Sequence, residues 1–141
     1  DLLPDNARPF TPESNHKTWG DRLQPLGSWR ITPATRSLIV LEGFFDLLLT
    51  AQKLHQLGRD ADTVAVYTNG SSPSAKMLDW FRCHPGYEYI LLSDPDPAGE
   101  EWIQTVSAAI RHGGGQAHAI RPPGSLDPDE AILDGWWPSE I

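Results

Sequence analysis

Short apolar runs rich in β-favouring residues alternate along the chain with longer segments whose apolar residues recur at helical spacing. The runs predict strands at residues 38–41, 63–68, 87–93 and 116–121. The helical spacing falls on residues 47–57, 75–81 and 97–112, with a short helix after the fourth strand. Parallel neighbouring strands need helical crossovers of this length, so the pattern predicts an α/β fold with a four-stranded parallel sheet flanked by helices.

The rest of the chain lacks this regularity. Residues 1–36 are rich in Pro, Asn, Ser and Thr and show no sustained period, which predicts an irregular N-terminal lead-in that packs through Phe10, Trp19 and Trp29. The α/β unit then occupies residues 37–135, and residues 136–141 form a C-terminal tail. Trp136 and Trp137 either close the core or dock on a neighbour, and one of them is expected to be exposed if both lie on a helix.

Composition and charge narrow the function. Eleven basic against nineteen acidic side chains give a net charge of −8, which opposes unaided binding to nucleic-acid phosphates. A nucleic-acid role would therefore need metal ions or a basic neighbour. The single cysteine, Cys83, cannot build a disulfide framework or a thiolate zinc site. No apolar run approaches the roughly 20 residues that span a bilayer, so we expect a soluble, cytoplasmic protein without a membrane. The start at Asp1 suggests processing or excision from a larger protein.

Acidic residues follow three of the four predicted strands. They are Glu42 and Asp46 after the first, Asp94 and Asp96 after the third, and Asp127, Asp129 and Glu130 after the fourth. Ligands of open parallel sheets gather beyond the carboxyl ends of the strands. Mg²⁺ and similar hard cations prefer oxygen ligands, and clustered acids can hold the two or three ions used in phosphoryl transfer. The pattern therefore predicts a site for Mg²⁺ or Mn²⁺.

The second strand is followed by a different kind of turn. The stretch TNGSSPS offers an amide, hydroxyls and backbone N–H groups at Asn69, Gly70 and Ser71. Such groups suit contacts to phosphate oxygens.

Structural explanations compete with metal binding at several of these acids. Asp96 before Pro97 suits a helix N-cap, and the Asp–Pro–Asp–Glu run from Asp127 spells a capping box. Asp46 could equally be a solvated helix residue. Glu42 is harder to explain structurally, because glutamate is a poor turn former and interrupts an apolar strand exit. Asp94 precedes the helix body by too many residues to be needed as a cap.

Three motifs in order resemble a known family. LIVLEGFFDLL resembles the first motif of the TOPRIM domain in bacterial DnaG-type primases, in which an apolar strand ends in Glu–Gly–aromatic–x–Asp. LLSDPDPAGEE is similar to the second motif, Asp–x–Asp followed by a small residue and Gly. RPPGSLDPDEAIL resembles the primase signature, in which a proline-containing loop leads to Asp–Pro–Asp and another acid. The YTNGSSPS turn also matches in place. The resemblance covers residues 37–135 and implies a TOPRIM, Rossmann-like fold.

The resemblance also implies roles for individual residues. Glu42 matches the essential acid of the first motif, which acts on the nucleophile or through a metal. The metal-binding positions are matched by Asp94, Asp96, Asp127 and Asp129, with Asp46 as the helix acid beside Glu42. Lys17, in ESNHKTWG, is similar to a phosphate contact at the end of a neighbouring basic subdomain.

In a primase these groups serve nucleotidyl transfer. The metals position a nucleoside triphosphate and the 3′ hydroxyl of the growing RNA on a single-stranded DNA template. The implied function is RNA primer synthesis in a DNA replication protein. The resemblance leaves open whether the isolated domain is active by itself. The implied partners are the template, the triphosphates and other domains of a larger parent protein, with a helicase among the candidates.

Two positions depart from the family pattern. Pro95 stands where Gly is usual and removes a backbone N–H. Glu100 stands where a basic residue is usual and is expected to weaken the attraction for template or nucleotide. These departures leave open a non-catalytic TOPRIM module that binds a protein or nucleic acid. A TOPRIM nuclease or a topoisomerase-like strand-cleaving enzyme is the other alternative, although the Asp–Pro–Asp–Glu run favours the primase branch.

Overall fold

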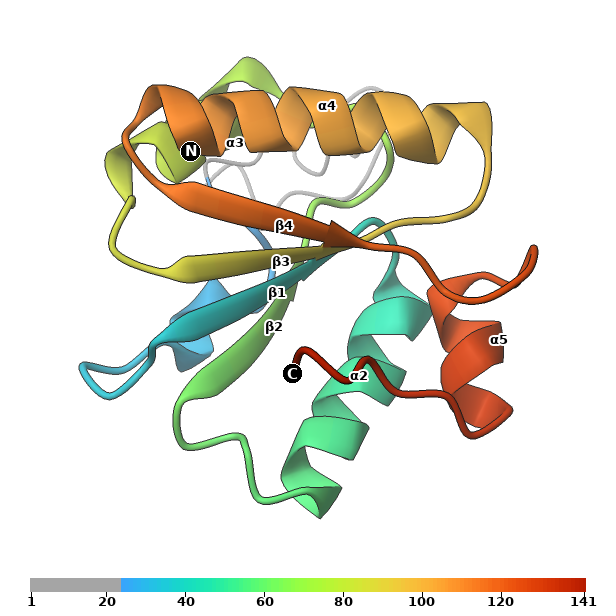
Figure 1. Ribbon diagram of the computed structural model, residues 1–141. Coiled ribbons are helices and arrows are strands. Elements are labelled where there is room, and N and C mark those ends of the chain that lie inside the picture. The colour runs from blue at the N-terminus through green and yellow to red at the C-terminus, as the bar shows by residue number, and fades with distance from the viewer. Residues whose placement is uncertain (1–23) are drawn as a thin grey trace, which may run out of the picture.

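The computed structural model describes residues 24–141 and contains one four-stranded parallel sheet within them (Figure 1). Its strands are β1 (Ser37–Leu41), β2 (Thr63–Tyr67), β3 (Glu88–Leu92) and β4 (Gln116–Ile120), in the order β2-β1-β3-β4. The predicted fold class is confirmed, and every strand boundary lies within one residue of its predicted position.

Helices cover both faces of the sheet. They are α2 (Phe44–Gln56), α3 (Ala75–Cys83), α4 (Pro97–His112) and the short α5 (Pro128–Leu133). Helices α3 and α4 lie on one face, and α2 and α5 lie on the other (Figure 1). None of the helices in the described part of the chain is long and apolar enough to cross a membrane.

Successive residues of each strand pack alternately into two separate hydrophobic cores, one on each face of the sheet. Leu38 and Val40 of β1 pack with Phe81 of α3 and Trp102 of α4, whereas the intervening Ile39 packs on the α2 side. Strands buried on both faces read as continuous apolar runs, which is why the sequence pattern located them well.

The strand order fixes where a ligand site can form. From β1 the chain crosses through α2 to β2 on one side, whereas from β3 it crosses through α4 to β4 on the other side and over the opposite face. Because crossovers of one hand must change face when they change direction, the connections diverge between the neighbouring strands β1 and β3. In open α/β sheets this divergence opens a crevice at the carboxyl ends of the two strands.

The described part of the lead-in packs against the edge strand β2. Leu26 and Tyr67 form an antiparallel bridge with N–H···O distances of 2.9 and 3.0 Å. The 3-10 helix η2 (Ser28–Arg30) follows. The expectation that Trp29 packs inward is wrong, since its side chain is 73% exposed. The neighbouring Arg30, also exposed, donates to Ala65 O at 3.1 Å. Phe10 and Trp19 lie outside the described residues.

The C-terminal tail returns to the α2 face of the sheet. Helix α5 ends at Leu133, and Gly135 adopts a positive φ of 95° that turns the chain. Trp136, Trp137 and Ile141 all pack against the core on this face. Of the two alternatives, closing the core is the one that the structure shows; neither tryptophan lies on a helix, so both can turn toward the core.

Close packing of α3 against the end of α4 depends on Gly113. A Cβ atom at Gly113 would lie 2.1 Å from Arg82 O, whereas a Cβ at Gly86 would meet nothing within 4 Å. We expect Gly113→Ala to lower the free energy of unfolding by about 1–3 kcal/mol, because backbone must move to admit the methyl group. The matched change Gly86→Ala should alter it by about 0.5 kcal/mol or less. Urea unfolding of both variants measures the difference, and equal stabilities would show that the helices are not packed this closely.

Candidate metal centre

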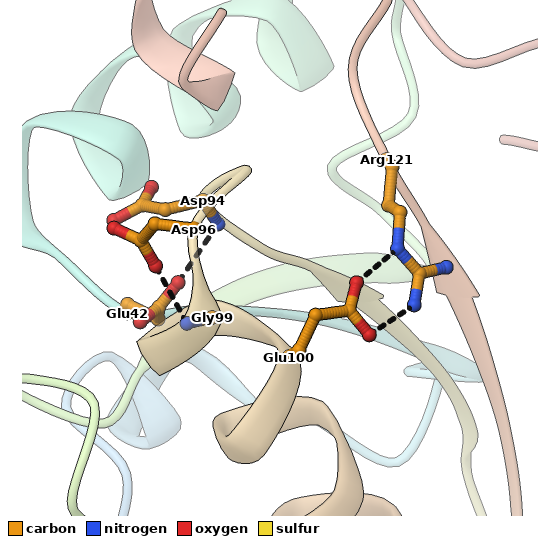
Figure 2. A network of polar contacts seen from close by, with 6 residues as sticks. All are labelled: Glu42, Asp94, Asp96, Gly99, Glu100 and Arg121. Carbon is orange, nitrogen blue, oxygen red and sulfur yellow. Dashed lines mark hydrogen bonds and ion pairs between the residues drawn. The ribbon is translucent and has the colours of Figure 1, made fainter. Parts of the chain in front are cut away.

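Glu42 lies at the crevice between β1 and β3. It directly follows the buried residues of β1 and is only 6% exposed. The backbone N–H of Asp94, which leaves the end of β3, donates to Glu42 Oε2 at 2.8 Å (Figure 2). This bond joins the exits of two strands and leaves Glu42 Oε1 unengaged by it.

Asp46 holds a second pair of elements together. It sits in the first turn of α2 and is 8% exposed, so the alternative of a solvated helix residue is wrong. Its Oδ1 accepts a hydrogen bond from the Asp129 N–H at 3.0 Å. The carboxylate of α2 therefore fixes the start of α5 and with it the acids of the last motif.

Asp96 is the N-cap residue of α4, as the sequence suggested. Its Oδ1 accepts from the Gly99 N–H at 2.7 Å, and Pro97 opens the helix. Gly99 is required here because a Cβ would lie 2.1 Å from Asp94 O. The loop after β3 thus folds tightly onto the first turn of α4, and Asp94 and Asp96 extend their carboxyl groups side by side (Figure 2).

The acids after β4 form the tightest carboxylate group in the described chain. Asp127, Asp129 and Glu130 each offer a carboxylate oxygen, and these oxygens lie within 4.8 Å of one another. Asp127 is the N-cap of α5, and its N–H donates to Glu130 Oε1 at 3.1 Å. Glu130 was not among the predicted metal ligands. Its position as the last acid of the Asp–Pro–Asp–Glu run could have indicated a metal ligand. This glutamate was instead explained as part of a capping box.

Burial and repulsion by neighbouring carboxylates raise the pKa of four of these acids: Glu42, Asp46, Asp94 and Asp127. Burial raises the pKa of Glu42 to about 7 against the opposing effect of the Asp94 N–H, and repulsion by nearby aspartates adds to the rise. Burial likewise raises the pKa of Asp46 to about 7, with repulsion by Asp94 and Asp129 adding to it. Burial, followed by repulsion from Asp127 and Asp96, raises the pKa of Asp94 to about 6. Burial, followed by repulsion from Glu130 and Asp129, raises the pKa of Asp127. The acids of all three strand exits therefore form one electrostatic cluster.

The two departures from the family pattern have structural explanations. The loop after β3 is held through the N–H groups of Asp94 and Gly99, so the N–H that Pro95 lacks is not needed for these bonds. Glu100 points away from the acids toward Arg121, to which it forms two hydrogen bonds of 2.6 and 2.8 Å (Figure 2). The Arg121 guanidinium group thus offsets the charge of Glu100, and the expectation that Glu100 weakens the attraction for template or nucleotide stays a prediction.

The turn after β2 is fixed against the same site. Asn69 and Gly70 both have positive φ, at 61° and 115°. The Gly70 N–H donates to Glu42 O at 2.7 Å, and Thr68 Oγ1 donates to Gly70 O at 2.8 Å. Asn69 and Ser71 are exposed beside this turn, whereas the N–H of Gly70 is already used. Lys17 lies outside the described residues.

Comparison with known proteins gives these elements a family. A family model described as Toprim-like matches residues 39–132, from within β1 to within α5. The chain belongs to the Toprim-like family. A comparison with curated proteins gives no match.

A solved structure supports the Toprim-like fold. The chain is similar to the crystal structure of the Aquifex aeolicus primase, zinc-binding and RNA polymerase domains, with a TM-score of 0.52 and 23% identity. The similarity covers 70% of this chain but only 22% of the Aquifex chain. The resemblance to a primase TOPRIM domain is thus confirmed at the level of family and fold.

The raised pKa values predict an unusual stability profile for the metal-free chain. The unfolded state loses the protons of Glu42 and Asp46 near their ordinary pKa values of 4.5 and 3.8, whereas the folded state holds them to about 7. Between these values the folded state binds more protons, so the free energy of unfolding falls as the pH rises. With chelator present, we expect the melting temperature to drop by roughly 5 °C between pH 5 and pH 7.5.

The control for this profile is Glu42→Gln, whose side chain does not titrate. Its melting temperature should fall less over the same range. A melting temperature that rises toward pH 7.5 in the unmodified chain would contradict the electrostatic cluster.

Proposed function

We propose that this domain carries out metal-dependent nucleotidyl transfer, as the RNA primer synthesis domain of a primase-like DNA replication protein. The observation that carries the proposal is the convergence of acids from three strand exits on the crevice between β1 and β3. Folding brings like charges together at a free-energy cost, and bound cations would offset that cost.

The donor set suits hard divalent cations. Every side chain of the cluster offers carboxylate oxygen, the ligand that Mg²⁺ and Mn²⁺ prefer. The proposed ligands are Asp94, Asp96, Asp127 and Asp129, with Asp46 as a further acid. Bound Mg²⁺ or Mn²⁺ would stabilise negative charge on the attacking and leaving oxygens of the phosphoryl group.

The residues of the chain have separate roles in this proposal. Glu42 is the catalytic residue and acts as a general base: its raised pKa suits proton exchange near neutral pH, and Oε1 is the atom proposed to accept the proton of the 3′ hydroxyl. Asn69 and Ser71 contact phosphate from the turn after β2, joined by Lys17. Gly70 contributes the shape of the turn, because its N–H is bonded to Glu42 O.

The proposed setting is a larger parent protein. The lead-in of residues 1–36, the TOPRIM domain of residues 37–135 and the tail of residues 136–141 form its catalytic unit. Other domains of the parent supply basic groups for single-stranded DNA and nucleoside triphosphates, with a helicase as a candidate partner. We place the protein in the cytoplasm.

Three features favour the non-catalytic alternative: Pro95, Glu100 and the lack of a basic patch, and the first two have structural explanations. The site's loop is held without an N–H at residue 95, and Glu100 is balanced by Arg121. Strand cleavage by a nuclease or topoisomerase uses the same kind of acids, so the reaction itself has to separate that alternative from primer synthesis.

Metal binding is the first consequence to test. Calorimetric titration of Mn²⁺ into the unmodified chain should show binding at pH 7.5 that weakens as the pH falls below about 7, where protons compete for Glu42 and Asp46. We expect Asp94→Asn with Asp96→Asn to weaken it by at least about tenfold.

The chain offers a matched control for that double variant. Asp60 and Asp62 are also separated by one residue but precede β2. They therefore lie at the amino ends of the strands, opposite the proposed site. Asp60→Asn with Asp62→Asn should leave Mn²⁺ affinity unchanged. Equal affinities of the two double variants would contradict the proposed site.

Activity is the second consequence. The full-length parent protein should make short RNA from nucleoside triphosphates on single-stranded DNA with Mg²⁺ or Mn²⁺. Glu42→Gln should reduce the rate by about 100-fold or more, since it removes the proposed proton acceptor. Glu101→Gln, an exposed residue of α4, is the control. DNA cleavage without RNA synthesis would instead assign the domain to the nuclease branch.

A further inference from the structure

The loop between β4 and α5 has few fixed points of its own. It consists of Pro122, Pro123, Gly124, Ser125 and Leu126. Three of these five residues are exposed, and Gly124 has a positive φ of 66°. No hydrogen bond of the described chain ties residues 122–126 to another element. The position of Asp127, which follows the loop, must therefore be set largely at the ends of this segment.

Both ends of the segment are anchored to helices. Beyond the loop, the Asp129 N–H is bonded to Asp46 Oδ1 on α2 at 3.0 Å. Before the loop, Arg121 Nε and one terminal nitrogen donate to the two carboxylate oxygens of Glu100 on α4, at 2.6 and 2.8 Å. Two parallel hydrogen bonds fix orientation as well as distance, which a single ion pair does not.

A contact made by Glu100 can fix the position of the acids after β3. It lies in the first turn of α4, next to Gly99, whose backbone packs against Asp94 O and bonds Asp96 Oδ1. Asp94, Asp96 and Glu100 thus belong to one tightly folded turn (Figure 2). The Glu100–Arg121 pair ties the exit of β4 directly to that turn.

Without this tie the acids would be expected to separate. Asp127 lies close enough to Asp94 for the repulsion between the two carboxylates to raise the pKa of Asp94. A loop held only through α5 could relax this repulsion by moving Asp127 outward. Because the repulsion is present before any cation is bound, a contact that acts in the metal-free chain is needed to resist it.

We propose that Glu100 and Arg121 are positioning residues that hold the Asp127 and Asp129 carboxylates against Asp94 and Asp96 for divalent-cation binding. The proposal rests on the proposed function, whose metal site the pair would complete. Neither residue touches the cation. Their effect runs through the loop and through the first turn of α4.

The direction in which one substitution changes Mn²⁺ affinity separates a positioning role from a simple effect of charge. Arg121→Met removes a positive charge near the acids, so Coulomb attraction alone predicts tighter Mn²⁺ binding. Positioning predicts weaker binding, by about tenfold, because the carboxylates are no longer held together. Glu100→Ala should weaken binding to a similar degree. The control Glu101→Ala removes a charge from the next residue of α4 and should have a smaller effect.

Exchange of the two charges tests the contact itself. Glu100→Arg combined with Arg121→Glu leaves the net charge unchanged and allows the pair to form again. It should restore Mn²⁺ affinity to within about threefold of that of the unmodified chain. An effect of either residue's own charge would not be rescued in this way, and thermal melting of each variant separates a loss of Mn²⁺ affinity from a loss of general stability.

The experiment is a Mn²⁺ titration of the 141-residue chain and its variants, with amide NMR spectra of the metal-free forms. In Arg121→Met we expect shifts of the amide signals of Ser125, Leu126, Asp127 and Asp129 that the charge exchange reverses. Unchanged or tighter Mn²⁺ binding by Arg121→Met would overturn the positioning role while leaving the metal site intact. Absence of Mn²⁺ binding by the unmodified chain would overturn the proposed function and the positioning role with it.

Discussion

Repulsion among carboxylates at one edge of the sheet is the constraint around which the rest of this structure is arranged. Separate contacts oppose it: the Asp94 N–H on Glu42, the Asp129 N–H on Asp46, and Arg121 on Glu100. Each contact joins two elements that are distant in sequence. The parallel sheet supplies the frame, because it delivers several strand exits to one edge and separates the connections of β1 and β3.

Capping and metal binding are compatible at the same residues. Asp96 Oδ1 accepts the Gly99 N–H, yet a carboxylate has a second oxygen with acceptor capacity of its own. The N-cap contact fixes the side chain and so reduces the entropy lost on binding a cation. Asp127 is likewise the N-cap residue of α5, and its N–H is bonded to Glu130 Oε1. The structural and functional interpretations of these acids therefore support each other.

The fold was largely readable from the sequence, because buried parallel strands such as Ser37–Leu41 are continuous apolar runs bounded by turns. The position of the acids at the carboxyl edge followed from the same pattern. The strand order did not, since local periodicity carries no information on which strands pair. The Glu100–Arg121 pair joins residues 21 positions apart, and the inward turn of Trp136 and Trp137 depends on where α5 ends. Such features arise from the crossing of elements, which spacing along the chain does not encode.

The acidic cluster also gives a physical reason for the negative net charge of the chain. A net charge of −8 opposes a polyanionic partner, but several of the acids responsible lie in one cluster that holds protons up to about pH 6 to 7. A group that binds protons this strongly near neutral pH also attracts divalent cations, because both relieve the same repulsion. Bound cations would reverse the local sign of the potential at the crevice while the remaining surface stays acidic. Phosphates would then be attracted to the crevice and repelled by the rest of the surface. In the proposed function, an acidic chain would therefore bind nucleic acid at the site rather than diffusely over its surface.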